Sequence, residues 1–191
     1  KEGKLGLRLL SHVSGFANPG TLTALMGSSG AGKTTLLDVL AGRKTTGRIE
    51  GDILLNGHEA DPVTFNQFAG YVEQMDVHSS TMTVSEALLF SARLRLPREV
   101  PDADKEAHVW QIVEMLNLQP FAHSLIGTRE DGLSVEQVKR VTIGVEMAAN
   151  PAVLFLDELT SGLDSMAADL VLEALMAVKR TGRTLICTIH Q

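Results

Sequence analysis

One segment of eight residues constrains the fold of this chain more than any other. Its sequence is Gly27-Ser28-Ser29-Gly30-Ala31-Gly32-Lys33-Thr34. This order fits G-x-x-x-x-G-K-S/T, a turn that binds phosphate when it joins a strand to a helix. Residues 21–26 are apolar and β-prone, and residues 35–42 have helical spacing. The sequence therefore predicts a strand, a phosphate-binding turn and a helix, in that order.

The chemistry of such a turn comes mainly from its backbone. Glycines allow successive N–H groups to converge on phosphate oxygens at a helix N-terminus, where the helix dipole favours an anion. Lys33 adds a positive charge for β- and γ-phosphates, and the Thr34 hydroxyl can ligate Mg²⁺. The residues expected to bind the phosphates are Gly27, Ser28, Ser29, Gly30, Ala31, Gly32, Lys33, Thr34 and Thr35.

Two acidic residues follow a second apolar run. Residues 152–156 read as a buried strand that ends in Asp157, and Glu158 comes next. A carboxylate at this position is suited to the Mg²⁺ shell, and the neighbouring one to accept a proton from an attacking water. Two acids at a strand end are common in proteins, but downstream of a phosphate-binding turn they favour a metal ligand, Asp157, and a general base, Glu158.

Gln74 and His190 also follow predicted strands. Gln74 comes after residues 69–73, where its amide can reach both Mg²⁺ and the catalytic water. His190 comes after residues 184–189, where it can contact the γ-phosphate. Because the carboxyl ends of parallel strands meet at one edge of a sheet, we expect both side chains near Lys33. Taken singly, each is also typical of an ordinary strand end.

Strand and helix patterns alternate along the chain, which favours an α/β fold with a mainly parallel sheet. Residues 47–59 read as an antiparallel ribbon with a tight Asn56-Gly57 turn. Three helical patterns then follow without a strand between them, which predicts a helical insertion. The expected division is an α/β core at about 18–47 and 146–191, β-ribbon parts at about 1–17 and 48–73, and a helical insertion at about 75–145.

Composition narrows the possible partners. The 191 residues carry a net charge of −6 without a basic run, so nucleic acid is not an expected partner. The single cysteine, Cys187, excludes an internal disulfide framework and suits a packed thiol. No apolar run approaches the roughly 20 residues that cross a bilayer. The chain lacks an initiator Met and stops directly after a predicted strand, so we expect it to belong to a longer polypeptide.

The stretch "GLSVEQVKR" adds a helix start. Ser134 is placed to cap the helix, and Gln137 lies three residues later, which is the spacing of a capping box. Thr83 and Glu86 have the same spacing before another helical pattern. Both segments are therefore predicted helix N-termini.

These motifs, in this order, resemble the nucleotide-binding domain of ABC transporters. "GSSGAGKTT" is similar to the Walker A motif, Gln74 to the Q-loop glutamine, "LSVEQ" to the signature, "VLFLDE" to Walker B, "SGLD" to the D-loop and His190 to the switch histidine. The resemblance implies a RecA-like P-loop NTPase core that binds ATP and Mg²⁺. It assigns catalysis to Glu158, His190, Gln74 and Lys33, and Mg²⁺ to Thr34, Gln74 and Asp157.

Finer features resemble the G subfamily of the pleiotropic drug resistance type. They are "LLNGH", "MTVSEALLFSARLRLP", "VKRVTIGVEMAANP" and "TSGLDS". The resemblance implies an exporter of drug- or lipid-like substrates, with this domain on the cytoplasmic face of a membrane beside the transporter's transmembrane domains. In this group two nucleotide-binding domains share two ATP sites, each formed by the P-loop of one domain and the signature of the other. Ser134 and Gln137 would then contact the nucleotide held by a partner domain.

The signature departs from the usual LSGGQ, because Val135 and Glu136 replace its glycines. A carboxylate about 4 Å from a phosphate charge costs about 4 kcal/mol at an effective dielectric constant of about 20, and the helix dipole returns only about 1 kcal/mol. The same replacement is found in the second nucleotide-binding domain of pleiotropic-drug-resistance transporters. We therefore expect a non-identical partner domain and one competent ATP site, built on Lys33, Asp157 and Glu158.

Two other functions share parts of this pattern. A soluble ABC-type ATPase of translation or DNA repair usually has an intact signature and a basic surface. A small P-loop kinase is disfavoured by Gln74, the signature and the D-loop. Two further positions are notable: Leu159 stands where the family usually has Pro, and Phe16 is expected in the core instead of stacking on adenine.

Overall fold

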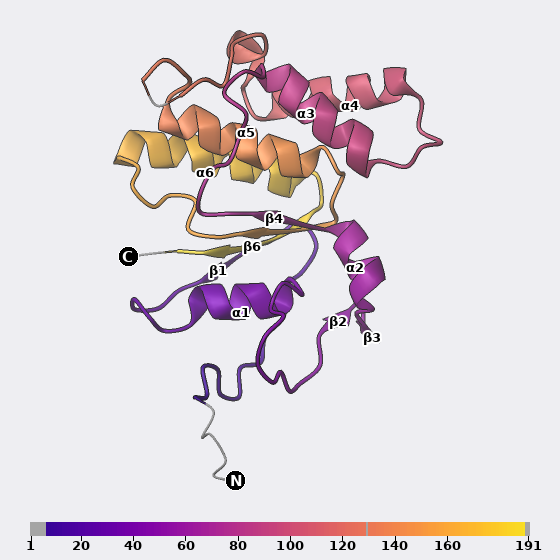
Figure 1. The fold of residues 1–191 in the computed structure, drawn as a ribbon. Coiled ribbons are helices and arrows are strands. Elements are labelled where there is room, and N and C mark those ends of the chain that lie inside the picture. The colour runs from indigo at the N-terminus through magenta and orange to yellow at the C-terminus, as the bar shows by residue number, and fades with distance from the viewer. Residues whose placement is uncertain (1–6, 129, 190–191) are drawn as a thin grey trace.

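A parallel sheet forms the centre of the molecule. The computed structural model describes residues 7–128 and 130–189. Its four main strands are ordered β1 (Leu22–Leu25), β6 (Thr184–Thr188), β5 (Val153–Leu156) and β4 (Ala69–Val72), and each neighbouring pair is parallel (Figure 1). The predicted mainly parallel α/β fold is confirmed. All four carboxyl ends consequently lie along one edge, where β1, β4 and β5 lead into the predicted site residues.

Helices cover both faces of this sheet. In Figure 1, α1 (Lys33–Leu40) lies below it, and α5 (Val135–Met147) and α6 (Ser165–Arg180) lie above it. Side chains alternate along β5, as they do in any strand. Val153 and Phe155 pack in the core on the α1 side, and Leu154 and Leu156 pack in the larger core under α5 and α6. All four are buried, which explains the continuous apolar run.

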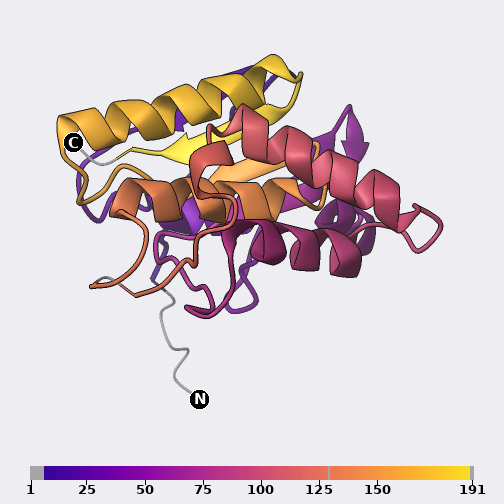
Figure 2. The ribbon, with the colours of Figure 1, turned by 90° about the horizontal axis from the view of Figure 1, so that it is seen from above.

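Two more helices stack on α5 to make the helical layer. They are α3 (Val84–Arg95) and α4 (Asp102–Met115), followed by the short 3₁₀ turn η1 (Gln119–Phe121), and Figure 2 shows α3 and α4 packed beside α5. Gly144 permits this approach, because a Cβ there would lie 3.1 Å from Leu88 and 3.2 Å from Leu116. The three predicted helices are present, and Thr83 and Glu86 form the predicted capping box.

The hairpin predicted at Asn56-Gly57 is present but is shorter than the predicted ribbon over residues 47–59. It joins β2 (Leu54–Leu55) to β3 (His58–Glu59), and both turn residues have positive φ, as a two-residue hairpin requires. Helix α2 (Pro62–Phe68) follows, capped by the Asp61 side chain, and was not predicted.

The segment before β1 differs from its expectation. The structure assigns no strand to residues 7–20. Phe16 is 86 % exposed, so its expected place in the core is wrong. Gly15, Asn18 and Pro19 favour turns around it, and no sheet partner brings its ring to the core. Within the described residues, none of the helices is long and apolar enough to cross a membrane.

Candidate functional site

The glycine-rich turn runs directly from β1 into α1. Gly30 and Gly32 have φ values of 77° and 93°, in the left-handed region that side chains disfavour. Gly32 is the N-cap of α1 and offers no side-chain acceptor to the first-turn N–H groups. These N–H groups point out of the helix N-terminus, which makes the turn suited to an anion. The main-chain N–H groups, and not a side chain, therefore give this turn the geometry expected for binding phosphate.

Lys33 folds back over this turn. The side chain is buried, and Nζ donates to the carbonyl oxygens of Gly27 at 2.8 Å and Ser28 at 3.1 Å. An ammonium group has three N–H donors, so one remains after these two hydrogen bonds. Lys33 is thus held at the mouth of the turn and retains a donor for a phosphate oxygen.

Thr34 and Asp157 meet beside the turn. The Thr34 hydroxyl donates to Asp157 Oδ1 at 3.1 Å, although the two residues come from different ends of the chain. Asp157 is 6 % exposed and directly follows β5. A hydroxyl and a carboxylate are oxygen ligands of the kind that Mg²⁺ takes, together with waters and phosphate oxygens. This pair fits the predicted magnesium ligands. Among the described residues, no group of three or more His, Cys, Asp or Glu side chains is arranged to hold a metal ion.

Thr188 is a site residue that the sequence analysis missed. It is the last residue of β6, is 2 % exposed, and donates its hydroxyl hydrogen to Asp157 Oδ1 at 2.7 Å. Its oxygen accepts the Glu158 N–H at 2.8 Å. One hydroxyl therefore fixes both acidic residues. The sequence signal that could have identified Thr188 is a polar residue at the end of a buried strand.

Replacing Thr188 with Val is expected to lower the free energy of unfolding by about 1–3 kcal/mol. The Glu158 N–H then loses its partner in a partly buried place, and Asp157 loses a donor. Urea unfolding measures the change, and Thr184→Val at the other end of β6 is the control, expected to stay within about 0.5 kcal/mol. An equal effect of both variants would contradict the role assigned to the Thr188 hydroxyl.

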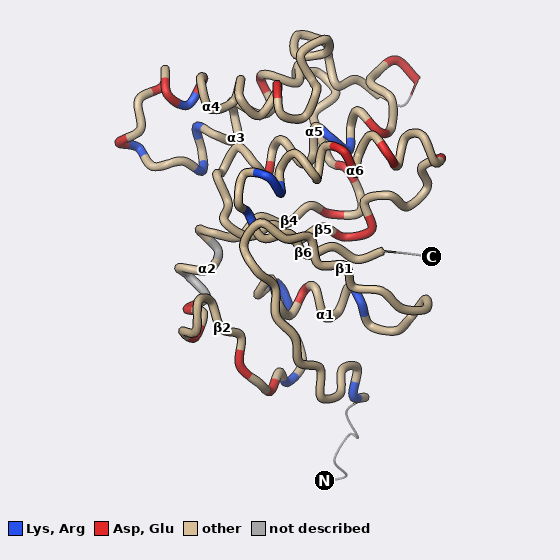
Figure 3. The backbone as a smooth tube through the Cα atoms, turned by 180° about the vertical axis from the view of Figure 1, so that it is seen from behind, with Lys and Arg blue, Asp and Glu red and all other residues tan. Residues whose placement is uncertain are grey.

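Gln74, two residues after β4, contacts the Glu158 carboxylate. Its Nε2 donates to Glu158 Oε2 at 3.0 Å, across 84 residues of sequence. Figure 3 shows acidic positions, in red, where β4 and β5 end. The structure thus brings Lys33, Thr34, Gln74, Asp157 and Glu158 to one edge of the sheet. His190, the remaining predicted member, lies outside the described residues.

The signature segment forms its own small network at the start of α5. Ser134 and Gln137 make the predicted capping box, through Gln137 N to Ser134 Oγ and Ser134 N to Gln137 Oε1. Glu136 does not project from the helix end. Arg140 donates to its carboxylate from Nε at 3.0 Å and from NH2 at 2.8 Å, and the Ser134 hydroxyl donates to Glu136 Oε1 at 3.0 Å. Val135 remains half exposed.

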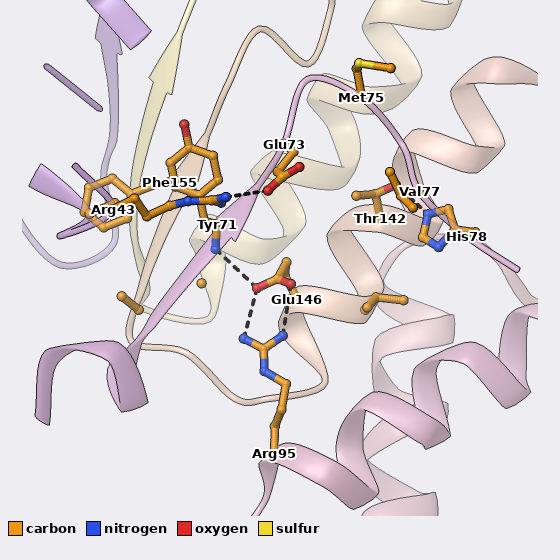
Figure 4. A pocket seen from close by; sticks show the side chains of 14 residues that line it. Arg43, Tyr71, Glu73, Met75, Val77, His78, Arg95, Thr142, Glu146 and Phe155 are labelled. Atoms are coloured by element: carbon orange, nitrogen blue, oxygen red, sulfur yellow. Dashed lines mark hydrogen bonds and ion pairs between the residues drawn. The ribbon is translucent and has the colours of Figure 1, made fainter. Parts of the chain in front are cut away.

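A cavity of about 490 Å³ lies beside the segment that follows β4 (Figure 4). At one end, Arg43 pairs with Glu73 and lies over the Tyr71 ring, 4.1 Å from its centroid. Burial is the main cause of the raised pKa of Tyr71, whose hydroxyl also donates to Asp38. Arg95 makes two hydrogen bonds to Glu146 at another wall. Nothing in the sequence pattern had predicted this cavity.

Comparison with known proteins agrees with this geometry. A family model described as ABC transporter matches residues 10–161. The chain is 54 % identical over 186 residues to ABC transporter G family member 31 of Arabidopsis thaliana. The aligned region covers 97 % of this chain and 13 % of that protein. It is 53 % identical over 185 residues to the ABC-type transporter eriD of Hericium erinaceus, covering 96 % of this chain and again 13 % of the relative.

Among solved structures, one described as the structure of the ATP binding subunit of an ABC transporter is similar in fold. The two superpose with a TM-score of 0.72 at 23 % identity, over 98 % of this chain and 75 % of the other. The match thus covers three quarters of that solved structure, whereas the chain spans only 13 % of the length of its curated relatives.

Proposed function

The chain belongs to the ABC transporter family, with relatives in its G subfamily, and we propose that it hydrolyses ATP to drive export across a membrane. One observation carries the proposal. The Thr188 hydroxyl joins two hydrogen-bonded pairs beside the phosphate-binding turn, Thr34 with Asp157 and Gln74 with Glu158. This arrangement supplies a place for phosphates, a pair of metal ligands and a base.

In the proposed reaction the turn and Lys33 bind the β- and γ-phosphates of ATP. Thr34 and Asp157 would hold Mg²⁺, which would supply positive charge to the phosphates. Glu158 accepts a proton from the water whose oxygen bonds to the γ-phosphorus, while the bond from that phosphorus to the bridging oxygen breaks and ADP leaves. The Gln74 amide, already on Glu158, orients that water. His190 would contact the γ-phosphate.

We further propose that hydrolysis requires a second, non-identical nucleotide-binding domain. Ser134 and Gln137 would face the nucleotide of that partner, and the partner's own signature would close the site built on Lys33. A dimer of two identical domains would place a signature without its glycines at both ATP sites. This chain is thus most like the second nucleotide-binding domain of a pleiotropic-drug-resistance transporter.

The contacts of Glu136 change the reason why this signature is expected to work poorly. The sequence suggested charge repulsion of about 4 kcal/mol at an effective dielectric constant of about 20. Arg140 offsets that repulsion, because its guanidinium binds the carboxylate in a nearly buried pair. The larger defect is the Ser134 hydroxyl, whose single hydrogen is donated to Glu136 and not to a phosphate.

Restoring the signature tests this assignment. We expect Val135→Gly with Glu136→Gly to free the Ser134 hydroxyl and raise turnover at the second site by at least about tenfold. The measurement is phosphate release by the full-length transporter with Glu158→Gln, which leaves only the second site able to react. Val135→Gly alone is the matched control, since Glu136 then still holds Ser134. Unchanged turnover in the double variant would show that these residues do not limit the second site.

The transmembrane domains are proposed to dock at the cavity beside β4, on the cytoplasmic face. Met75 and Val77 line it and are 76 % and 81 % exposed, which is unusual for apolar side chains that no partner covers. They lie one and three residues after Gln74, so a shift at this surface reaches the catalytic group directly. Drug- or lipid-like molecules are the proposed substrates.

A further inference from the structure

Lys139 is a buried charge that the proposed reaction does not use. It lies on α5, little more than one turn after the N-cap residue Ser134, and is 4 % exposed. Its Nζ donates to the main-chain carbonyl oxygen of Gln74 and pairs with Asp76 Oδ2 at 2.9 Å. A buried ammonium group loses several kcal/mol of hydration, so its partners largely determine where it lies. Both partners belong to the segment that carries Gln74.

The same segment is bound to α5 at a second point. Thr142 Oγ1 has one hydrogen, and its two acceptors are Asp76 Oδ1 at 2.6 Å and the Val138 carbonyl oxygen at 3.0 Å. His78 Nε2, 2.7 Å from Thr142 Oγ1, must then carry a hydrogen and donate it to Thr142. Thr142 lies one turn after Lys139 on the same face of α5. Figure 4 shows Thr142 and His78 side by side at the wall of the cavity.

Gln74 is consequently held from two sides. Its carbonyl oxygen accepts from Lys139 on α5, and its side-chain amide donates to Glu158 after β5. The residue itself is exposed, and β4 ends at Val72, so the sheet does not fix it. The position of the amide relative to Glu158 therefore depends on where the Lys139 ammonium holds the main chain.

We propose that Lys139 is a positioning residue for ATP hydrolysis, which holds the main chain of Gln74 so that its amide stays on Glu158. The inference rests on the proposed function. If Lys139 acts in this way, catalysis depends on the position of α5. Because Ser134 caps the N-terminus of α5, binding at the signature of the second site is transmitted through Lys139 to the first.

The test uses the full-length transporter and separates the carbonyl contact from the ion pair. Lys139→Met with Asp76→Asn removes the contact to Gln74 without leaving a buried unpaired charge. We expect kcat for ATP to fall about tenfold, since a small misplacement of a catalytic group is costly, and KM to stay within about twofold. Asp76→Asn alone keeps the Lys139 contact and most of the turnover. Lys105→Met is the matched control, because it removes another buried lysine, on α4.

A cycle with Gln74→Ala distinguishes positioning from a general structural role. If Lys139 acts through Gln74, adding the Lys139 and Asp76 substitutions to Gln74→Ala changes kcat by less than about twofold. The proposal is overturned by a full tenfold loss of kcat in the Gln74→Ala background. It is also overturned if kcat does not fall when Gln74 is intact. If the double variant does not fold, Lys139→Gln with Asp76→Asn replaces it; its smaller loss of kcat must likewise disappear with Gln74→Ala.

The two proposals fail differently. Turnover that survives Glu158→Gln contradicts the proposed hydrolysis itself. Turnover that is lost with Glu158→Gln but unaffected by Gln74→Ala leaves the hydrolysis in place and overturns the role of Lys139.

Discussion

Glu158→Gln is expected to lower the ATP turnover of the full-length transporter by about 100- to 10 000-fold. Glutamine has the shape of glutamate but accepts no proton from water, so the base is lost. Its side-chain oxygen still accepts the Gln74 amide hydrogen bond seen at 3.0 Å, so the geometry around it is kept. Phosphate release measures turnover, and ATP binding measured separately is expected to stay unchanged.

Glu173→Gln is the matched control for that experiment. Glu173 is an exposed glutamate of α6, and the same substitution there is expected to leave turnover unchanged. Undiminished turnover of Glu158→Gln would exclude Glu158 as the base, and the proton acceptor would have to be sought elsewhere at the carboxyl edge of the sheet.

Arg140→Met is expected to lower the free energy of unfolding of the chain by about 3–5 kcal/mol, the largest stability effect anticipated here. The Arg140 side chain is 7 % exposed and donates to the carbonyl oxygens of Leu116 and Asn117 as well as to Glu136. Methionine fills much of the volume but leaves the Glu136 carboxylate, 14 % exposed, without a partner. The midpoint of urea unfolding measures the change.

The charge of Glu136 accounts for part of this expected loss. Arg140→Met with Glu136→Gln removes the unpaired carboxylate and is expected to recover about 1–2 kcal/mol relative to Arg140→Met alone. The control is Arg93→Met, which breaks the exposed pairs with Asp102 and Glu106 and is expected to cost no more than about 1 kcal/mol. If the single and double variants of Arg140 unfold at the same urea concentration, Glu136 is not destabilised by losing its partner.

The sequence predicted those features whose signals are local. The phosphate-binding turn and both capping boxes are short patterns with a fixed spacing, and a buried parallel strand such as β5 is a continuous apolar run. Helix α2 also had a local signal, since Asp61 precedes Pro62 at the first helical position, but that signal was overlooked. The pairing of Glu136 with Arg140 likewise follows a spacing of four residues.

Contacts between distant segments could not be predicted in this way. Lys139 and Gln74 are 65 residues apart, and Thr188 and Asp157 are 31 apart. No sequence pattern says which polar group a buried lysine or threonine will meet. The exposed Phe16 illustrates the opposite error, because an aromatic residue was assigned to the core although its neighbours favour turns.

The backbone at Glu158 has a consequence for stability. Five described residues other than glycine have positive φ; three are asparagines, one is His12, and the other is Glu158 at 45°. Asparagine and glycine tolerate this conformation, whereas glutamate is strained in it. Replacing Glu158 with asparagine or glycine would thus relieve backbone strain but remove the carboxylate that the proposed reaction uses. The proposed activity and the stability of the backbone therefore place opposite demands on this single position.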